Sequence, residues 1–209
     1  MRFQKRDGEI LLAIYENDGV FARRHLKEIF WSDKSWRAME VRLSKLHQEE
    51  YIDWPTRDQY KINPISEPVC WLGWRGALLV AGKSGVTVEK PNGNNKYQLR
   101  KFQKELKDHG VRWVSEPPWS LLNHNLAVID IKLAVQREVE ENPLFTLEQW
   151  IPESVFRAKP DVVEYPVRDH EGNIVRRKKG VCPDASFFIV MTSTVVAVAG
   201  AGVLVSIGV

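Results

Sequence analysis

Apolar residues recur at helical spacing through the first fifty residues of the chain. The spacing predicts one amphipathic helix over residues 7–17 and a second over residues 20–31. A third and longer helix is predicted over residues 32–53, with Ser32, Asp33 or Ser35 as the side chain that caps its first turn. One face of this helix carries the residues that we expect to be buried, namely Trp36, Met39, Leu43 and Leu46. Two short helices followed by a longer one predict a tri-helical unit.

The opposite face of the third predicted helix is polar and cationic. Its side chains include Lys34, Arg37, Ser44, Lys45 and Gln48. Such a face is usually just a solvated surface. However, Lys and Arg also pair with phosphates, and Arg and Gln hydrogen-bond to base edges. The pattern therefore leaves two interpretations, a solvated surface or a helix that enters the major groove of DNA.

A short hairpin is predicted directly after the three helices. Residues 51–53 and 59–62 have the pattern of short strands, and a polar turn separates them. Three helices and a hairpin predict a winged helix-turn-helix domain over residues 7–64, in which the hairpin is the wing. Arg57 at the tip of the wing and Lys61 at its base are expected to hold phosphates. The alternative is a winged helix that binds protein or dimerises.

The pattern changes after residue 64. Residues 65–94 are expected to connect two domains, through a strand, a helix from Trp74 to Ala81 and a linker rich in Gly and Asn. Residues 95–190 alternate between helical and strand patterns and predict an α/β domain. The elements expected there are a helix over residues 95–109, a long helix over residues 121–141, a strand around Trp150, a hairpin around residues 169–173 and a core strand over residues 181–190. The first of these helices has a basic outer face, which is either solvated or a second contact for nucleic acid.

Composition narrows the class of protein. The chain has 209 residues, of which 44% are hydrophobic, and this is ample for a globular core. Its net charge is only +3, so a nucleic-acid surface requires local clusters of cations. Cys70 and Cys182 are far apart and belong to no Cys-x-x-Cys pair, which argues against a zinc knuckle and a disulfide scaffold. The polar amino terminus does not look like a signal peptide, and we expect a cytoplasmic protein.

The end of the chain, residues 185–209, is apolar and uncharged. It is long enough to cross a membrane as a helix, and the four basic residues Arg176 to Lys179 before it would then stay on the cytoplasmic side. A tail anchor at the cytoplasmic face of the membrane is one interpretation of residues 191–209. A buried β-strand is another. A third is a truncated product of a shifted reading frame, because the composition changes abruptly to Val, Ala, Gly, Ser and Thr.

Several short motifs occur in an order that resembles a known family. They are RLSKLHQEEYI from Arg42 to Ile52, Trp71-Leu72-Gly73 with Gly76, LNHNLAVID from Leu122 to Asp130, Trp150 to Glu153, and Pro183-Asp184-Ala185 before an apolar strand. In this order they resemble the replication-relaxation proteins of bacterial plasmids and integrated elements, over roughly residues 7–190. The resemblance implies an amino-terminal winged helix, a carboxy-terminal α/β region and a protein that binds double-stranded DNA. It also implies a role in plasmid replication or DNA relaxation, together with plasmid replication or mobilisation proteins.

The second half also resembles the PD-(D/E)xK nuclease fold, which is the fold of restriction endonucleases. Glu153 and Asp184 are the candidate catalytic carboxylates, since two carboxylates on adjacent strands can hold Mg²⁺ beside a phosphate. No charged residue follows Asp184, so the acid and Lys that would complete the site are missing. We therefore expect an α/β protein of the α+β kind, with a winged helix followed by an apparently truncated nuclease-like domain that is non-catalytic or catalytically incomplete. The alternatives are a metal-dependent DNA nuclease and a membrane-tethered winged-helix adaptor.

Overall fold

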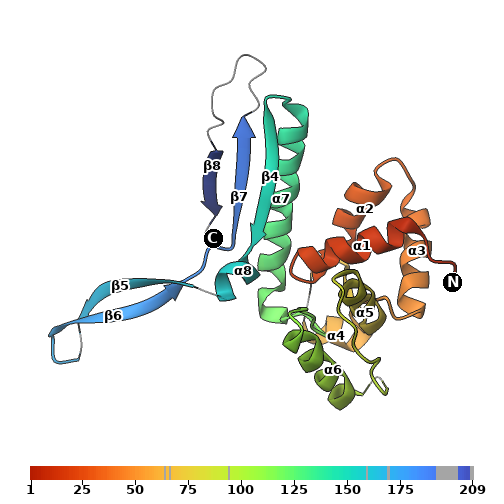
Figure 1. Ribbon diagram of the computed structural model, residues 1–209, viewed down its shortest axis with the longest axis horizontal. Coiled ribbons are helices and arrows are strands. Elements are labelled where there is room, and N and C mark those ends of the chain that lie inside the picture. Colours follow the sequence, from red (N-terminus) through yellow and green to blue (C-terminus); the bar gives the residue numbers. More distant parts are fainter. Residues whose placement is uncertain are drawn as a thin grey trace. The chain divides into compact units, whose positions relative to one another are not determined.

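The chain is a mixed α and β protein that divides into two compact units. A computed structural model describes residues 1–63, 65, 67–93, 95–158, 160–168, 170–191 and 202–207 (Figure 1). The first unit runs from Met1 to Asp130 and the second from Ile131 to Val209. Each unit is described by itself below.

The first unit contains most of the helices and one small sheet. Its elements are α1 (Lys5–Glu16), β1 (Val20–Ala22), α2 (Arg23–Trp31), α3 (Trp36–Gln48), β2 (Ile52–Asp53), α4 (Arg57–Ile62), β3 (Val69–Leu72), α5 (Trp74–Lys83), α6 (Lys96–Asp108), a 3-10 turn (Trp119–Leu121) and the first part of α7 (Leu122–Glu141). The three strands pair in the order β1-β3-β2, and both pairings are antiparallel. The central strand β3 therefore lies within the segment that was expected to connect two domains.

The third predicted helix is confirmed as α3, with shorter bounds. Ser35 caps it, since the Ser35 hydroxyl accepts a hydrogen bond of 3.2 Å from the backbone N–H of Ala38. The expected apolar face is buried at Met39, Leu43 and Leu46. The expectation for Trp36 is wrong, because this side chain is 52% exposed. Trp36 is the first residue of the helix and lies almost one turn before the first position that the core covers.

The second predicted helix begins three residues later than expected. Asp18 and Gly19 follow α1 with φ of 58° and 84°, so the chain reverses there. Residues 20–22 then form β1, in which Val20 is the partner of Trp71 in β3. A fully buried run of three residues carries no periodicity, which is why the pattern alone could not separate this strand from the helix after it.

The predicted hairpin is wrong in its second strand. Residues 59–62 belong to the short helix α4, where the Thr56 hydroxyl accepts a hydrogen bond from Gln59 N–H and the Gln59 side chain accepts one from Thr56 N–H. This reciprocal cap starts a helix rather than a strand. The antiparallel partner of β2 is β3, with Ile52 opposite Leu72. The connection between the paired strands is therefore residues 54–68, which include α4.

The second unit holds the rest of α7 and all remaining strands. Its elements are β4 (Phe145–Pro152), α8 (Glu153–Ala158), β5 (Asp161–Arg168), β6 (Ile174–Val181), β7 (Ala185–Met191) and β8 (Gly202–Ile207). One antiparallel sheet has the order β4-β7-β8, and β5 pairs with β6 as a separate ribbon. Trp150 of β4 stacks on Phe187 of β7 with 5.6 Å between the ring centroids. The strand expected around Trp150, the hairpin around residues 169–173 and the core strand before residue 190 are confirmed.

One expectation for the apolar end of the chain was a membrane-spanning helix. The described residues there form two strands instead, β7 and β8. β7 and β8 pair antiparallel, with Ala185 opposite Ile207. The helical interpretation is wrong for these two segments, while residues 192–201 and 208–209 lie outside the described residues. In the part of the chain that the structure describes, no helix combines the length and the apolar content that crossing a membrane requires.

Candidate functional site

One side of α3 presents cations and a polar side chain to solvent. Lys34 precedes the helix, and Arg37, Lys45 and Gln48 follow at positions that share a stripe; all four are exposed. Among the described residues, none of the four side chains has an ion pair or a hydrogen-bond partner. Their hydrogen-bonding groups are therefore available to a ligand.

A buried ion pair fixes the neighbouring side of α3. Asp7 of α1 is fully buried, and its carboxylate binds Arg42 through two contacts, one of them 2.7 Å from Arg42 Nε to Asp7 Oδ1. The backbone N–H of Gln4 donates to the same carboxylate at 2.6 Å. The hydrogen bonds that Arg42 donates to Asp7 raise the pKa of Arg42 above its ordinary value. Arg42 therefore holds α3 against α1 through Asp7, whereas Arg37 on the same helix is exposed.

A second polar cluster lies along another edge of α3. Arg23 Nη1 donates to Glu40 Oε2 at 2.6 Å, and the Arg23 guanidinium lies 4.8 Å from the centre of the Trp54 ring. The His47 ring stacks on the same indole, with 3.9 Å between centroids and 6° between planes. Ser44 is half-buried and lies one turn from both Glu40 and His47. Of the expected DNA-facing residues on α3, Ser44 therefore belongs to the edge beside Trp54 and not to the exposed stripe of Arg37.

The two expected phosphate contacts of the wing lie on α4. Arg57 begins this helix and is exposed, and its side chain has no ion pair or hydrogen bond within the described part of the chain. Lys61 is also exposed, but its Nζ lies 3.0 Å from Asp58 Oδ1. An exposed pair at this spacing contributes little to stability and leaves the cation accessible. Both cations remain on the connection between β2 and β3, on a helix instead of a strand.

A third set of cations lies on α6, as the sequence predicted. The exposed members are Lys96, Arg100, Lys101, Lys104 and Lys107. Phe102 and Leu106 on the other face are buried. This face remains either a solvated surface or a second contact for nucleic acid.

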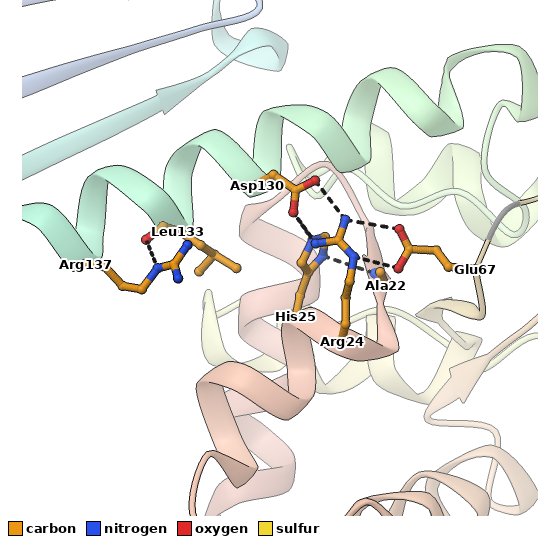
Figure 2. A network of polar contacts seen from close by, with 7 residues as sticks. All are labelled: Ala22, Arg24, His25, Glu67, Asp130, Leu133 and Arg137. Carbon is orange, nitrogen blue, oxygen red and sulfur yellow. Dashed lines mark hydrogen bonds and ion pairs between the residues drawn. The ribbon is translucent and has the colours of Figure 1, made fainter.

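An ion-pair network that the sequence analysis missed fixes the start of α2 (Figure 2). Arg24 binds Glu67 at 2.7 Å and 3.1 Å and binds both carboxylate oxygens of Asp130 on α7. His25 is fully buried, and its Nε2 lies 2.9 Å from Asp130 Oδ1 while its Nδ1 accepts the backbone N–H of Ala22. The contacts with Asp130 join residues more than 100 positions apart in sequence, and Arg24 and Glu67 are 43 positions apart, so no local pattern could have revealed these pairs.

The environment sets the charges in this network. Burial lowers the pKa of His25, so the neutral ring donates from Nε2 to Asp130. The hydrogen bonds from Arg24 hold the pKa of Asp130 below its ordinary value. Both oxygens of the Asp130 carboxylate are occupied by protein donors. The network therefore positions helices and is not arranged for chemistry.

The two candidate catalytic carboxylates flank the same end of one strand pair. Pro152 of β4 lies opposite Ala185 of β7, so Glu153 follows and Asp184 precedes at that end. Glu153 begins α8 instead of ending a strand, and its Oε1 accepts a hydrogen bond of 2.6 Å from Arg157 Nε. Among the described residues, no group of three or more His, Cys, Asp or Glu side chains is placed to hold a metal ion. Glu153 and Asp184 therefore have no third such side chain beside them, within the described ranges, to complete a Mg²⁺ site.

Comparison of this chain with protein-family models, with curated proteins and with solved structures found no match.

Proposed function

We propose that this chain binds double-stranded DNA through a winged helix-turn-helix in its first unit, with α3 as the helix that enters the major groove. The order of elements supports this proposal. The chain runs α1-β1-α2-α3-β2-α4-β3, so that without the short α4 the order is α1-β1-α2-α3-β2-β3, and the strands pair in the order β1-β3-β2. Winged helices have this order of helices and strands, with the wing between the last two strands. Here that connection is residues 54–68, which carry Arg57 and Lys61 on α4.

The exposed stripe of α3 is the single observation that carries the proposal. Leu43 and its buried neighbours fix the orientation of the helix, so Arg37 and Lys45 point away from the core. A major groove is wide enough to admit an α-helix. Cations that meet phosphates release the counterions bound to DNA, and this release favours binding to any sequence. The free cations of α3 therefore suit a duplex better than they suit an uncharged partner.

The side chains on this surface divide into two roles. Arg37 and Gln48 can hydrogen-bond to base edges, whereas Lys34 and Lys45 suit phosphates. Arg57 on α4 would add a phosphate contact beside the groove.

The resemblance to replication-relaxation proteins extends the proposal to plasmid replication or DNA relaxation in the cytoplasm, alongside plasmid replication or mobilisation proteins.

A binding titration of the full chain tests the α3 surface. We expect Lys45→Ala to weaken binding to all duplexes and to reduce the slope of log affinity against log salt by about 1, because one phosphate contact is lost. Arg37→Ala should instead relax the preference for one base pair, at a cost of about 1–3 kcal/mol on the preferred site. Fluorescence anisotropy with a labelled duplex at several salt concentrations measures both effects.

Lys5→Ala is the matched control for these variants. Lys5 is exposed on α1 and pairs weakly with Glu9 at 3.6 Å, so its replacement removes one charge from the same unit without touching α3. This control should bind DNA as the wild type does. Unchanged affinity in both Arg37→Ala and Lys45→Ala would show that α3 does not enter the groove.

A second candidate function is DNA cleavage in the second unit. The position of Glu153 and Asp184 at one end of the β4–β7 pair favours it, because two carboxylates there resemble part of a Mg²⁺ site. Incubation with supercoiled plasmid and Mg²⁺, followed by gel electrophoresis, provides the test. Nicking that persists in Asp161→Ala but is lost in Asp184→Ala would support the nuclease. Absence of nicking by the wild-type chain would contradict it.

A further inference from the structure

Among the described residues of the second unit, no third strand extends the β5–β6 ribbon. The two strands pair residue by residue from Asp161 opposite Val181 to Arg168 opposite Ile174. No other described strand pairs with either of them. Within the second unit, neither α7 nor α8 covers the ribbon in Figure 1. Almost every residue of the ribbon whose exposure is described is exposed. Within the second unit, both faces of the ribbon are thus open to a partner.

On the first face of the ribbon, two cations share one acid. In an antiparallel pair, directly opposite residues point to the same side, and the next pair points to the other side. Glu164 lies opposite Lys178, and Pro166 lies opposite Arg176. The Glu164 carboxylate contacts Lys178 Nζ at 2.9 Å and Arg176 Nη1 at 3.9 Å. This surface, which we name the Glu164 face, also carries Arg168 opposite Ile174, so its one acid compensates only part of its positive charge.

The second face of the ribbon keeps its cations free. Tyr165 lies opposite Arg177, and Val163 lies opposite Lys179. Both cations are exposed, and neither has an ion pair or hydrogen-bonded side-chain partner within the described ranges. Tyr165 is 39% exposed and Val163 is 48% exposed. This surface, which we name the Tyr165 face, combines an aromatic ring, apolar side chains and two available positive charges, with the carboxylate of Asp161 at its end opposite Val181.

Such a ribbon gains stability from a partner. A two-stranded antiparallel pair is at best marginally stable in water when nothing packs on it. A second copy of the chain suits the ribbon poorly as a partner, because the four successive cations Arg176 to Lys179 oppose pairing between identical strand edges. A polyanion satisfies the free cations, and the major groove of DNA admits a two-stranded ribbon as well as a helix.

We propose that the Tyr165 face of the β5–β6 ribbon is a second DNA-binding element, which lies in a groove of a duplex. Arg177 and Lys179 contact phosphates, and they are two residues apart, or about 6.7 Å along the strand. Tyr165 and Val163 pack against sugars and base edges between them. This inference rests on the proposed function in so far as the chain must bind duplex DNA, but it does not depend on α3.

Two double variants of the full chain with equal charge loss test the ribbon. Arg177→Ala with Lys179→Ala removes two cations from the Tyr165 face, and Arg176→Ala with Lys178→Ala removes two from the Glu164 face. We expect the first variant to bind a duplex about tenfold more weakly and to reduce the salt slope by about 2. The second should lose less than about threefold, because its cations already share Glu164 and point away from the groove. All four residues are exposed, and circular dichroism checks that both variants remain folded.

The outcomes separate the ribbon from α3. Equal losses in the two double variants would overturn the assignment to the Tyr165 face, because general attraction between opposite charges would then explain the binding. Wild-type affinity in the first variant, together with weakened binding in Lys45→Ala, would overturn the ribbon and leave α3 in place. Weakened binding in the first variant alone would support the ribbon and contradict α3. Self-association that the first variant abolishes without a change in DNA affinity would overturn the proposal in favour of a second copy.

Discussion

Helix α3 and the β5–β6 ribbon carry similar side chains, but different features of the structure determine which of their cations are paired with an acid. Both contain apolar residues and several Arg and Lys residues. On α3, tertiary packing determines which cation is paired with an acid. Arg42 reaches the buried Asp7, whereas Arg37 stays exposed. On the ribbon, alternation along the strand decides, since Lys178 pairs with Glu164 while Arg177 points to the other side.

The difference teaches how closely stability and binding are coupled in each region. The orientation of α3 depends on a core that belongs to the whole first unit, so changes on its buried side alter the fold. Almost all ribbon residues whose exposure is described are exposed, so within the second unit the ribbon is held mainly by the pairing of its own two strands. Substitutions on the Tyr165 face should therefore change binding with little change in stability.

The strongest test of this comparison replaces a core residue of α3. Leu43 is fully buried, and Leu43→Ala should lower the free energy of unfolding by about 4 kcal/mol, because the lost contacts leave a cavity. Val41→Ala on the same helix is the control, since Val41 is 50% exposed and its truncation should cost less than about 1 kcal/mol. Urea unfolding followed by tryptophan fluorescence measures both. Similar costs for the two variants would show that the buried and exposed sides of α3 are wrongly assigned.

A somewhat smaller effect is expected when the buried anion is removed. Asp7→Ala leaves Arg42 partly buried without its partner and should destabilise the chain by about 3 kcal/mol. Glu9→Ala breaks the exposed pair with Lys5 on the same helix and should cost less than about 0.5 kcal/mol. The same unfolding measurement applies. If Asp7→Ala were as mild as Glu9→Ala, the contact between α1 and α3 would not depend on this ion pair.

The smallest expected effect is a dependence of stability on pH. Burial holds the pKa of His25 below 6.5 in the folded chain, so the unfolded chain binds more protons as the pH falls below that value. The stabilisation is therefore present above pH 6.5 and is progressively lost towards lower pH. His25→Gln should flatten this dependence between pH 7.5 and about pH 5.5. His109→Gln, at an exposed position after α6, should retain the wild-type slope in urea unfolding at each pH.

Local patterns predicted the elements whose burial repeats along the chain. The apolar spacing of Met39, Leu43 and Leu46 located α3, and that of Phe102 and Leu106 located α6. The short helix α4 was missed, although Thr56 and Gln59 form a capping box that signals a helix start. Strand-like residues between 59 and 62 outweighed that signal. The capping box is the better signal here because its two hydrogen bonds form between residues three positions apart, whereas a strand forms only if a partner strand lies beside it.

The pairings between distant segments were beyond the reach of these patterns. β2 pairs with β3 across residues 54–68, and His25 meets Asp130 on α7. Neither contact leaves a periodic trace, because each depends on where the chain returns after many residues. The candidate carboxylates show the same limit. Their types were visible in sequence, but only the register of β4 against β7 brought Glu153 and Asp184 to one end of the sheet.

The order of residues by itself determined which stretches are helices with one apolar side, where positive charge gathers, and that no charged residue follows Asp184. The tertiary structure decided which of those charges remain available. A guanidinium that meets a buried carboxylate, as Arg42 meets Asp7, gains hydrogen bonds that hold it in place, whereas the exposed Arg37 side chain has no such partner among the described residues. That distinction depends on partners brought together by folding, which no single stretch of sequence contains.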